Sequence, residues 1–142
     1  VVFAQFMKGQ DSGEINILKS LENVTVLRAD NNDKFSFQMT AEEKAAAAAA
    51  NQKLLEDAFE TALKEDAFML VLDESVTACY KESISEDRLK VLIEQLKDKT
   101  EIIMTGNIPE VWMIEISDYV TDIEKIKHPF DKGVSARKGI EY

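Results

Sequence analysis

The sequence predicts an α/β protein with a parallel β-sheet and helices on both of its faces. Short apolar segments rich in Val, Ile, Leu and Phe recur along the chain. Such segments are typical of strands that are buried on both faces of a parallel sheet. Segments with a helical spacing of apolar residues lie between them, and this alternation implies right-handed crossovers between parallel strands.

The predicted strands are the short apolar segments that alternate with helical patterns. They are Val1–Met7, Val24–Leu27, Phe68–Leu72, Glu101–Met104 and Tyr119–Ile123. The chain begins inside the first of these segments, so we expect further residues before Val1. No stretch approaches the roughly 20 apolar residues that a membrane-spanning helix needs.

The predicted helices fill the intervals between the strands. They are Glu14–Leu21, a long helix that follows Thr40, Glu86–Lys97, and a last helix from Asn107 to about Ser117. Thr40 and Glu43 have the spacing of a capping box, in which each residue satisfies a backbone amide of the other. Asn107 is the expected cap of the last helix, with Pro109 in its first turn.

Composition and length narrow the class of protein. A chain of 142 residues, 45% hydrophobic and 31% charged, fits a single folded domain over 1–142, with a weakly patterned tail from 128 to 142. The net charge of −10 and the scattered basic residues argue against nucleic acid as a partner. The single cysteine, Cys79, cannot form an internal disulfide, which fits a reducing cytoplasm, and we expect it to be a small buried residue.

Polar residues follow the predicted strands at their carboxyl ends, where open α/β sheets bind ligands. They are Lys8 after the first strand, Asp73 and Glu74 after the third, Thr105, Gly106 and Asn107 after the fourth, and Lys127 and His128 after the fifth. Because these ends meet at one edge of a parallel sheet, the sequence predicts a polar rim there.

The strongest local signal is an apolar strand, 69–72, followed by Asp73 and Glu74. This is the Walker B arrangement, whose carboxylate holds Mg²⁺ against nucleotide phosphates. Apolar strands often end in acidic residues, so a solvated strand end remains an alternative. The 142 residues contain no GxxxxGK[ST] phosphate-binding loop.

Other candidate ligand-binding residues also have structural explanations. Basic side chains that could offset triphosphate charge, or simply lie at the surface, are Lys8, Lys127, Arg137 and Lys138. A structural hydrogen bond is favoured over a general-base role for His128. Phe35 and Phe37, within the polar segment 31–38, form either a ligand platform or a cover for the sheet edge.

Four segments together resemble one known family. Residues 6–9 with Gly13-Glu14 are similar to an FxKG…GE motif, 72–74 to LDE, and 105–106 to the start of TGR. Residues 127–134 and 136–142 are similar to KHxFxxGxxAxxGIEY/F. These are motifs of the ATP:corrinoid adenosyltransferases, and the resemblance is collinear from residue 1 to 142. The family's N-terminal strand, phosphate-binding loop and first helix have no counterpart in this sequence.

The resemblance implies a three-layer RecA-like fold of the P-loop NTPase type. It also implies an enzyme that transfers the 5′-deoxyadenosyl group of ATP to the reduced cobalt of a corrinoid and releases triphosphate. ATP, Mg²⁺ (or Mn²⁺) and the corrinoid are the implied ligands. A homodimer and a flavodoxin-like reductant are the implied partners.

The resemblance also implies roles for individual residues. Asp73 and Glu74 would manage Mg²⁺ and the phosphates. The residues on the nucleotide side would be Lys8, Thr105, Gly106, Asn107, Lys127 and His128. Phe35 and Phe37 would lie under the corrinoid and displace its lower axial ligand.

The sequence departs from the family pattern in places, and it leaves other functions open. Asn107 stands where the family has Arg, Lys34 replaces a Gly before the aromatic pair, and Ser75-Val76 replaces a Leu-Asn/Thr pair. One alternative is a non-catalytic relative that binds a corrinoid or a nucleotide without a phosphate-binding loop. Another is a different P-loop ATPase or kinase.

Overall fold

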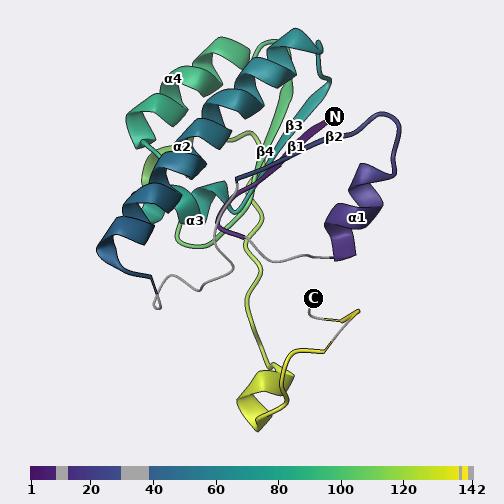
Figure 1. The fold of residues 1–142 in the computed structure, drawn as a ribbon, viewed down its shortest axis with the longest axis vertical. Coiled ribbons are helices and arrows are strands. Elements are labelled where there is room, and N and C mark those ends of the chain that lie inside the picture. Colours follow the sequence, from purple (N-terminus) through teal and green to yellow (C-terminus); the bar gives the residue numbers. More distant parts are fainter. Residues whose placement is uncertain (9–12, 30–38, 138, 141–142) are drawn as a thin grey trace.

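The fold is built around one parallel sheet whose strands come from distant parts of the chain. The computed structural model describes residues 1–8, 13–29, 39–137 and 139–140 (Figure 1). The strands are β1 (Val2–Gln5), β2 (Thr25–Arg28), β3 (Met69–Asp73) and β4 (Glu101–Met104). They lie in the order β2-β1-β3-β4, and every neighbouring pair is parallel. The predicted α/β class and the first four predicted strands are therefore confirmed.

Helices flank this sheet on both faces. They are α1 (Gly13–Lys19), α2 (Ala41–Lys64), α3 (Ser75–Tyr80), α4 (Glu86–Leu96) and α5 (Val111–Ile116), and the tail adds the 3₁₀ helix η2 (Pro129–Lys132). Figure 1 shows α2, α3 and α4 together over one face, with α1 on the opposite side. The arrangement agrees with the three layers of a RecA-like fold.

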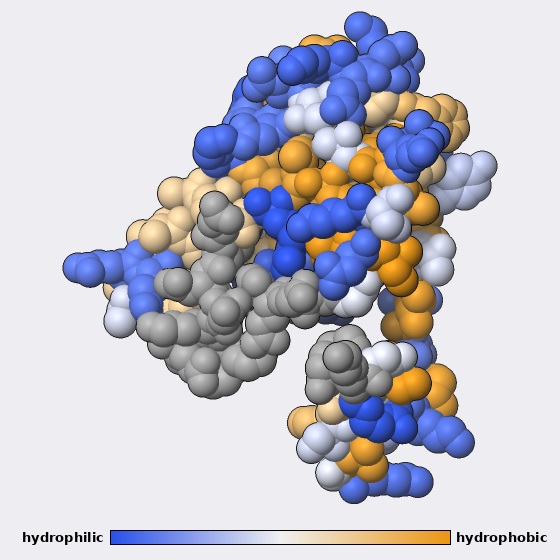
Figure 2. Space-filling view, turned by 45° about the vertical axis from the view of Figure 1, so that its right-hand side comes forward, coloured by the Kyte–Doolittle hydropathy of each residue, from blue (hydrophilic) through white to orange (hydrophobic). Residues whose placement is uncertain are grey.

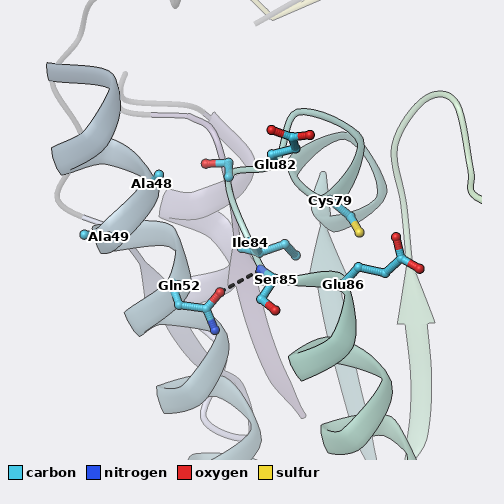
Figure 3. A pocket seen from close by; sticks show the side chains of 9 residues that line it. Ala48, Ala49, Gln52, Cys79, Glu82, Ile84, Ser85 and Glu86 are labelled. Atoms are coloured by element: carbon cyan, nitrogen blue, oxygen red, sulfur yellow. Dashed lines mark hydrogen bonds between the residues drawn. The ribbon is translucent and has the colours of Figure 1, made fainter. Parts of the chain in front are cut away.

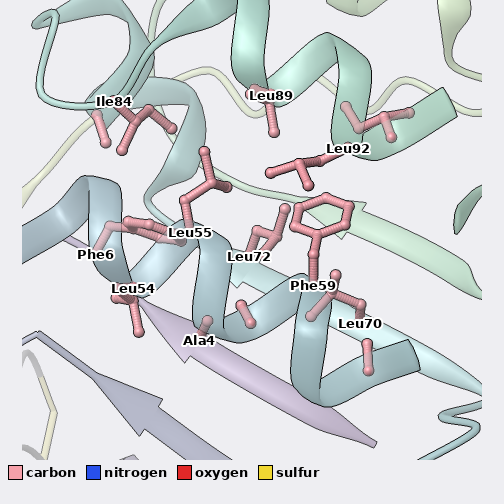
Figure 4. Packing of buried hydrophobic residues seen from close by; sticks show 14 of the residues in the cluster. Ala4, Phe6, Leu54, Leu55, Phe59, Leu70, Leu72, Ile84, Leu89 and Leu92 are labelled. Carbon is pink, nitrogen blue, oxygen red and sulfur yellow. The ribbon is translucent and has the colours of Figure 1, made fainter. Parts of the chain in front are cut away.

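The main core lies between the sheet and the α2–α4 layer. Val2 and Ala4 of β1 and Leu70 and Leu72 of β3 are fully buried on this face. In Figure 4, Ala4, Leu70 and Leu72 lie beneath side chains of α2 and α4, including Leu55, Phe59, Leu89 and Leu92. Each buried leucine contributes about 1.5–3 kcal/mol through the hydrophobic effect. This packing fixes how β1 and β3 lie against each other, and so fixes their carboxyl ends.

The predicted fifth strand is wrong. Residues 119–123 form no strand, and Tyr119 and Ile123 are 94% and 89% exposed. Apolar composition produced the strand signal, but a strand also needs a neighbour for its backbone hydrogen bonds. In the described ranges no strand pairs with this segment. The chain instead runs as an extended tail from the end of α5 to η2 (Figure 1).

The predicted start of the last helix is also wrong. The helix α5 begins at Val111, with Glu110 as the N-cap residue, so Asn107 and Pro109 precede it. Positive φ angles at Gly106 and Ile108 form a turn that is incompatible with a right-handed helix. The six-residue helix α3 was not predicted, because so short a helix has too few turns to show a period.

The predicted capping box of α2 is confirmed and yields a test. The Glu43 amide donates to Thr40 Oγ1 at 3.2 Å, and the Thr40 amide donates to Glu43 Oε2 at 2.9 Å. We expect Thr40→Ala to lower the free energy of unfolding of the full-length protein by about 1 kcal/mol. Urea denaturation measures the loss. Thr61→Ala, within the same helix, is the control and should cause none, because alanine is the better helix former. Equal midpoints for Thr40→Ala and wild type would contradict the role of the cap.

Candidate functional site

A cluster of polar side chains lies at the carboxyl ends of β1, β3 and β4. It consists of Gln5, Lys8, Glu14, Asp73 and Thr105, and we call it the rim cluster. Gln5 ends β1, Asp73 ends β3, and Thr105 directly follows β4. Glu14 comes from the first turn of α1. The predicted polar rim therefore exists at the ends of these three strands.

Asp73 is the centre of the rim cluster. Gln5 and Asp73 are direct partners in the parallel register of β1 and β3. Gln5 Nε2 donates to Asp73 Oδ2 at 3.0 Å, and Thr105 Oγ1 donates to Asp73 Oδ1 at 2.9 Å. Each carboxylate oxygen has two acceptor sites, so both retain capacity for a further ligand. The side chain of Asp73 is 23% exposed, so solvent reaches it.

Lys8 brings a positive charge to the same place. Its Nζ lies 3.6 Å from Asp73 Oδ2 and 3.9 Å from Glu14 Oε1. The side chains of Lys8 and Glu14 are about half exposed, so these ion pairs are screened by water and contribute little stability. Lys8 can therefore exchange its carboxylate partners for a phosphate at low cost.

Glu74 occupies a strained turn between β3 and α3. Its φ of 62° and ψ of 16° place it in the left-handed region, which costs a non-glycine residue about 1–2 kcal/mol. The Glu74 amide donates to Thr105 Oγ1 at 3.0 Å, so the hydroxyl that binds Asp73 also holds this turn. The Glu74 side chain does not cap α3. Backbone strain of this kind is concentrated at functional sites.

The loop after β4 is clamped against the first turn of α3. The Val76 amide donates to the carbonyl of Thr105 at 3.1 Å, and the Asn107 amide donates to Thr77 Oγ1 at 2.9 Å. Gly106 approaches so closely that a Cβ at this position would lie 2.6 Å from the Thr77 nitrogen. The structure thus brings Thr105 to Asp73 and fixes Gly106 and Asn107 beside α3.

Lys127 and His128 lie elsewhere. Because the fifth strand does not form, both residues belong to the exposed tail, and Figure 1 shows η2 well away from the strand ends. His128 Nδ1 accepts a hydrogen bond from the Phe130 amide at 3.1 Å and caps η2. That is the structural role that the sequence favoured over a general base. The structure does not bring these two residues to the rim cluster.

The aromatic pair Phe35 and Phe37 lies outside the described residues, as does Lys138. Their predicted roles stay predictions.

The space-filling view in Figure 2 shows hydrophilic side chains set among apolar ones on the body of the molecule, with the tail forming a separate lobe.

A cavity of about 540 Å³ lies away from the rim cluster, between α2 and the connection from α3 to α4. It is lined by Ala48, Ala49, Gln52, Cys79, Glu82, Ser83, Ile84, Ser85 and Glu86 (Figure 3). None of the predicted site residues that the structure describes lines it. Cys79 is buried, as predicted, and burial raises the pKa of its thiol, which disfavours the reactive thiolate. Predicted site residues therefore lie in the rim cluster and not among the described residues of this cavity.

Gln5 and Glu14 are site residues that the sequence analysis did not single out. Gln5 is the one polar residue inside the apolar run 2–7, and Glu14 belongs to the GE pair of the motif described above. Gln5 is fully buried, and its Oε1 has no hydrogen-bond partner among the described residues. A polar residue within a strand that is buried on both faces was the available signal.

The polar groups at the rim suit a magnesium ion, which needs few protein ligands, better than a metal ion held entirely by protein side chains. In the part of the chain that the structure describes, no three His, Cys, Asp or Glu side chains converge to hold a metal. Mg²⁺ is usually held by one or two carboxylates, water and substrate phosphates, so the Asp73 carboxylate fits this ion. Among the described residues, no helix has the length and apolar character needed to cross a membrane.

Comparison with known proteins points to one family. The model of the family described as ATP:corrinoid adenosyltransferase BtuR/CobO/CobP matches residues 1–142. A corrinoid adenosyltransferase of Sinorhizobium sp is 32% identical over 107 residues, which are 75% of this chain and 50% of that protein. One of Pseudomonas aeruginosa is 32% identical over 77 residues, 54% of this chain and 38% of that protein. The chain thus spans half or less of the length of these curated relatives.

The close approach at Gly106 yields a second test. An alanine there would contact Thr77 N, Thr77 Oγ1 and Val76 Cβ at 2.6–2.9 Å, with a φ of 144° that disfavours any side chain. We expect Gly106→Ala to destabilise the full-length protein by about 1–3 kcal/mol. Gly133→Ala is the matched control: its φ is also positive, at 77°, but nothing lies within 4 Å of the added Cβ. Thermal denaturation of both variants isolates the clash, and equal losses would contradict it.

Proposed function

This chain belongs to the ATP:corrinoid adenosyltransferase family, and we propose that the protein transfers the 5′-deoxyadenosyl group of ATP to the reduced cobalt of a corrinoid. The observation that carries the proposal is Asp73, held at the end of β3 by Gln5 and Thr105 with Lys8 beside it. A carboxylate and an ammonium at the ends of parallel strands are the groups that a magnesium-bound triphosphate needs.

The proposed reaction needs little covalent chemistry from the protein. The Co(I) corrinoid is the nucleophile and attacks the 5′ carbon of the ribose. A cobalt–carbon bond forms, the bond from C5′ to the phosphate oxygen breaks, and triphosphate leaves with the electron pair of that bond. Cobalt is thereby oxidised formally from Co(I) to Co(III). The contribution of the protein is to orient the two substrates and to exclude water.

In this proposal the acidic pair holds the metal. Asp73 and Glu74 bind Mg²⁺ (or Mn²⁺), directly or through water. The ion supplies positive charge against the triphosphate. Asp73 is suited to this role because both of its oxygens are already oriented by neutral donors, Gln5 Nε2 and Thr105 Oγ1.

The nucleotide side of the site combines a lysine with the loop after β4. Lys8 exchanges Glu14 and Asp73 for phosphate oxygens when ATP binds. Thr105, Gly106 and Asn107 form the wall beside the phosphates, at a position fixed by α3. Asn107 has a neutral amide where the family has Arg, so it offers hydrogen bonds without a charge.

The remaining predicted site residues belong to the tail and to the aromatic pair. In this proposal the tail residues contact the nucleotide, and the aromatic pair contacts the corrinoid. We propose that Lys127 and His128 reach the nucleotide only when the tail changes its position or belongs to a second subunit of a homodimer. Phe35 and Phe37 lie under the corrinoid and displace its lower axial ligand. Loss of that ligand raises the cobalt potential, so a flavodoxin-like donor can supply the electron.

The rest of the protein is also part of the proposal. We propose that 1–142 is one domain, and that a phosphate-binding loop precedes it in the full-length protein, as the family resemblance implies. The greater length of the relatives leaves room for such a segment. A cytoplasmic location follows from the need for a cellular reductant. The family match does not favour a non-catalytic relative or another P-loop ATPase.

The role of Asp73 is tested with the full-length protein, ATP, Mg²⁺ and chemically reduced corrinoid. We expect Asp73→Asn to lower the rate of adenosylcorrinoid formation, followed by absorbance, by about a hundredfold or more, because the metal loses its anionic ligand. Asp57→Asn, at an exposed carboxylate paired with Lys53 on α2, is the control and should keep the wild-type rate. An active Asp73→Asn variant would remove the proposed metal site. A wild-type protein that forms no cobalt–carbon bond would overturn the proposed function itself.

The aromatic pair is tested by the absorbance of bound Co(II) corrinoid. Wild-type protein with ATP should show the spectrum of a corrinoid without its lower ligand, and Phe37→Ala should lose that signature because the packing that displaces the ligand is gone. Phe68→Ala is the control, since Phe68 is 72% exposed and directly precedes β3, at the opposite edge of the sheet. An unchanged spectrum in Phe37→Ala would refute the role of the pair.

A further inference from the structure

Gln5 is an unusual residue for its position. It ends β1, an interior strand between β2 and β3, and it is fully buried. Its neighbours Ala4 and Phe6 are fully buried and apolar. A buried amide is costly unless its polar atoms are hydrogen-bonded, so an apolar side chain would suit the fold better here. The amide must therefore serve the groups around it.

The amide nitrogen of Gln5 acts on the carboxylates of the rim cluster. It donates to Asp73 Oδ2 at 3.0 Å and, more weakly, to Glu14 Oε1 at 3.4 Å. Thr105 donates to the other oxygen of Asp73. Asp73 is thus held by groups from β1 and from the end of β4, the two strands that flank β3. A carboxylate with both oxygens held in this way has a fixed plane.

The two carboxylates set the orientation of the Gln5 amide. Oε1 is buried and accepts no hydrogen bond from any described residue, whereas buried polar atoms in native proteins nearly always have a partner. Rotating the amide by half a turn would place Oε1 against the carboxylates of Asp73 and Glu14, which cannot donate. The orientation of the amide is therefore set, with its nitrogen toward the two carboxylates.

We propose that Gln5 is a positioning residue for the divalent cation of this site. Its nitrogen fixes the plane of the Asp73 carboxylate, which would hold the cation. Groups that orient a metal ligand in this way tune the affinity for the metal. The inference rests on the proposed function, because it requires Asp73 to hold the ion.

The test measures binding of Mn²⁺ to the full-length protein in the presence of ATP, by electron paramagnetic resonance of the free ion. Gln5→Met keeps the length of the side chain and removes both hydrogen-bonding atoms. We expect its Mn²⁺ dissociation constant to rise about tenfold or more. Thr100→Val is the matched control: Thr100 is buried and donates to the Ala67 carbonyl at 3.0 Å, just before β4, so it loses a buried hydrogen bond at the opposite edge of the sheet. Its Mn²⁺ affinity should equal that of wild type.

A double-mutant cycle separates positioning from a general structural effect. If Gln5 acts through Asp73, adding Gln5→Met to Asp73→Asn should cause little further loss of Mn²⁺ affinity. Wild-type affinity in Gln5→Met, or independent losses in the double variant, would overturn the inference. If Gln5→Met does not fold, Gln5→Asn gives the same test, because its shorter amide cannot reach Asp73.

The two proposals fail in different ways. A wild-type protein that binds Mn²⁺ with ATP but makes no adenosylcorrinoid would refute the proposed function, and the comparison of Mn²⁺ affinities would still decide the role of Gln5. Normal adenosyl transfer with unchanged Mn²⁺ affinity in Gln5→Met would refute only the role of Gln5.

Discussion

The candidate site depends on the parallel register between β1 and β3. Gln5 pairs with Asp73 in that register, and the hydrogen bond between their side chains joins the two strands at their carboxyl ends. Thr105 follows β4 directly and reaches the same carboxylate from the other side. Three segments separated by more than 30 residues therefore meet on one side chain. Any change in strand register would separate them.

The hydrophobic core sets this register. Val2 pairs with Leu70 and Ala4 with Leu72, and all four side chains are fully buried beneath α2 and α4. A slip of one residue would turn these side chains to the other face and expose apolar surface. Because side chains alternate along a strand, Gln5 and Asp73 then lie on the face toward α1, which supplies Glu14. The packing of one face thus determines the chemistry of the other.

This division also explains what the sequence could predict. Buried strands produce a strong apolar signal in the sequence. This signal predicted β1 to β4 and the acidic residue Asp73 at the end of β3. The same signal failed at 119–123, because composition does not reveal whether a neighbouring strand exists. The signal for Gln5 was a single polar residue in an apolar run, which does not show which group its side chain contacts. Its role follows only from its partner across the sheet, 68 residues away.

Local contacts hold the turns around Asp73 in place. Glu74 is held in a left-handed conformation by the Thr105 hydroxyl, and Gly106 has no space for a side chain against Thr77. The Glu74 conformation costs stability, and both features leave the rim formed before any ligand binds. In the proposed reaction a substrate, and not a protein side chain, is the nucleophile. The rate then increases because the protein orients the two substrates, and a preformed site is suited to this role. Burial raises the pKa of the Cys79 thiol, which disfavours its thiolate. This agrees with a proposed reaction that uses no protein nucleophile. In the proposed reaction, these preformed polar groups orient the nucleotide and its metal, and other segments bind the corrinoid.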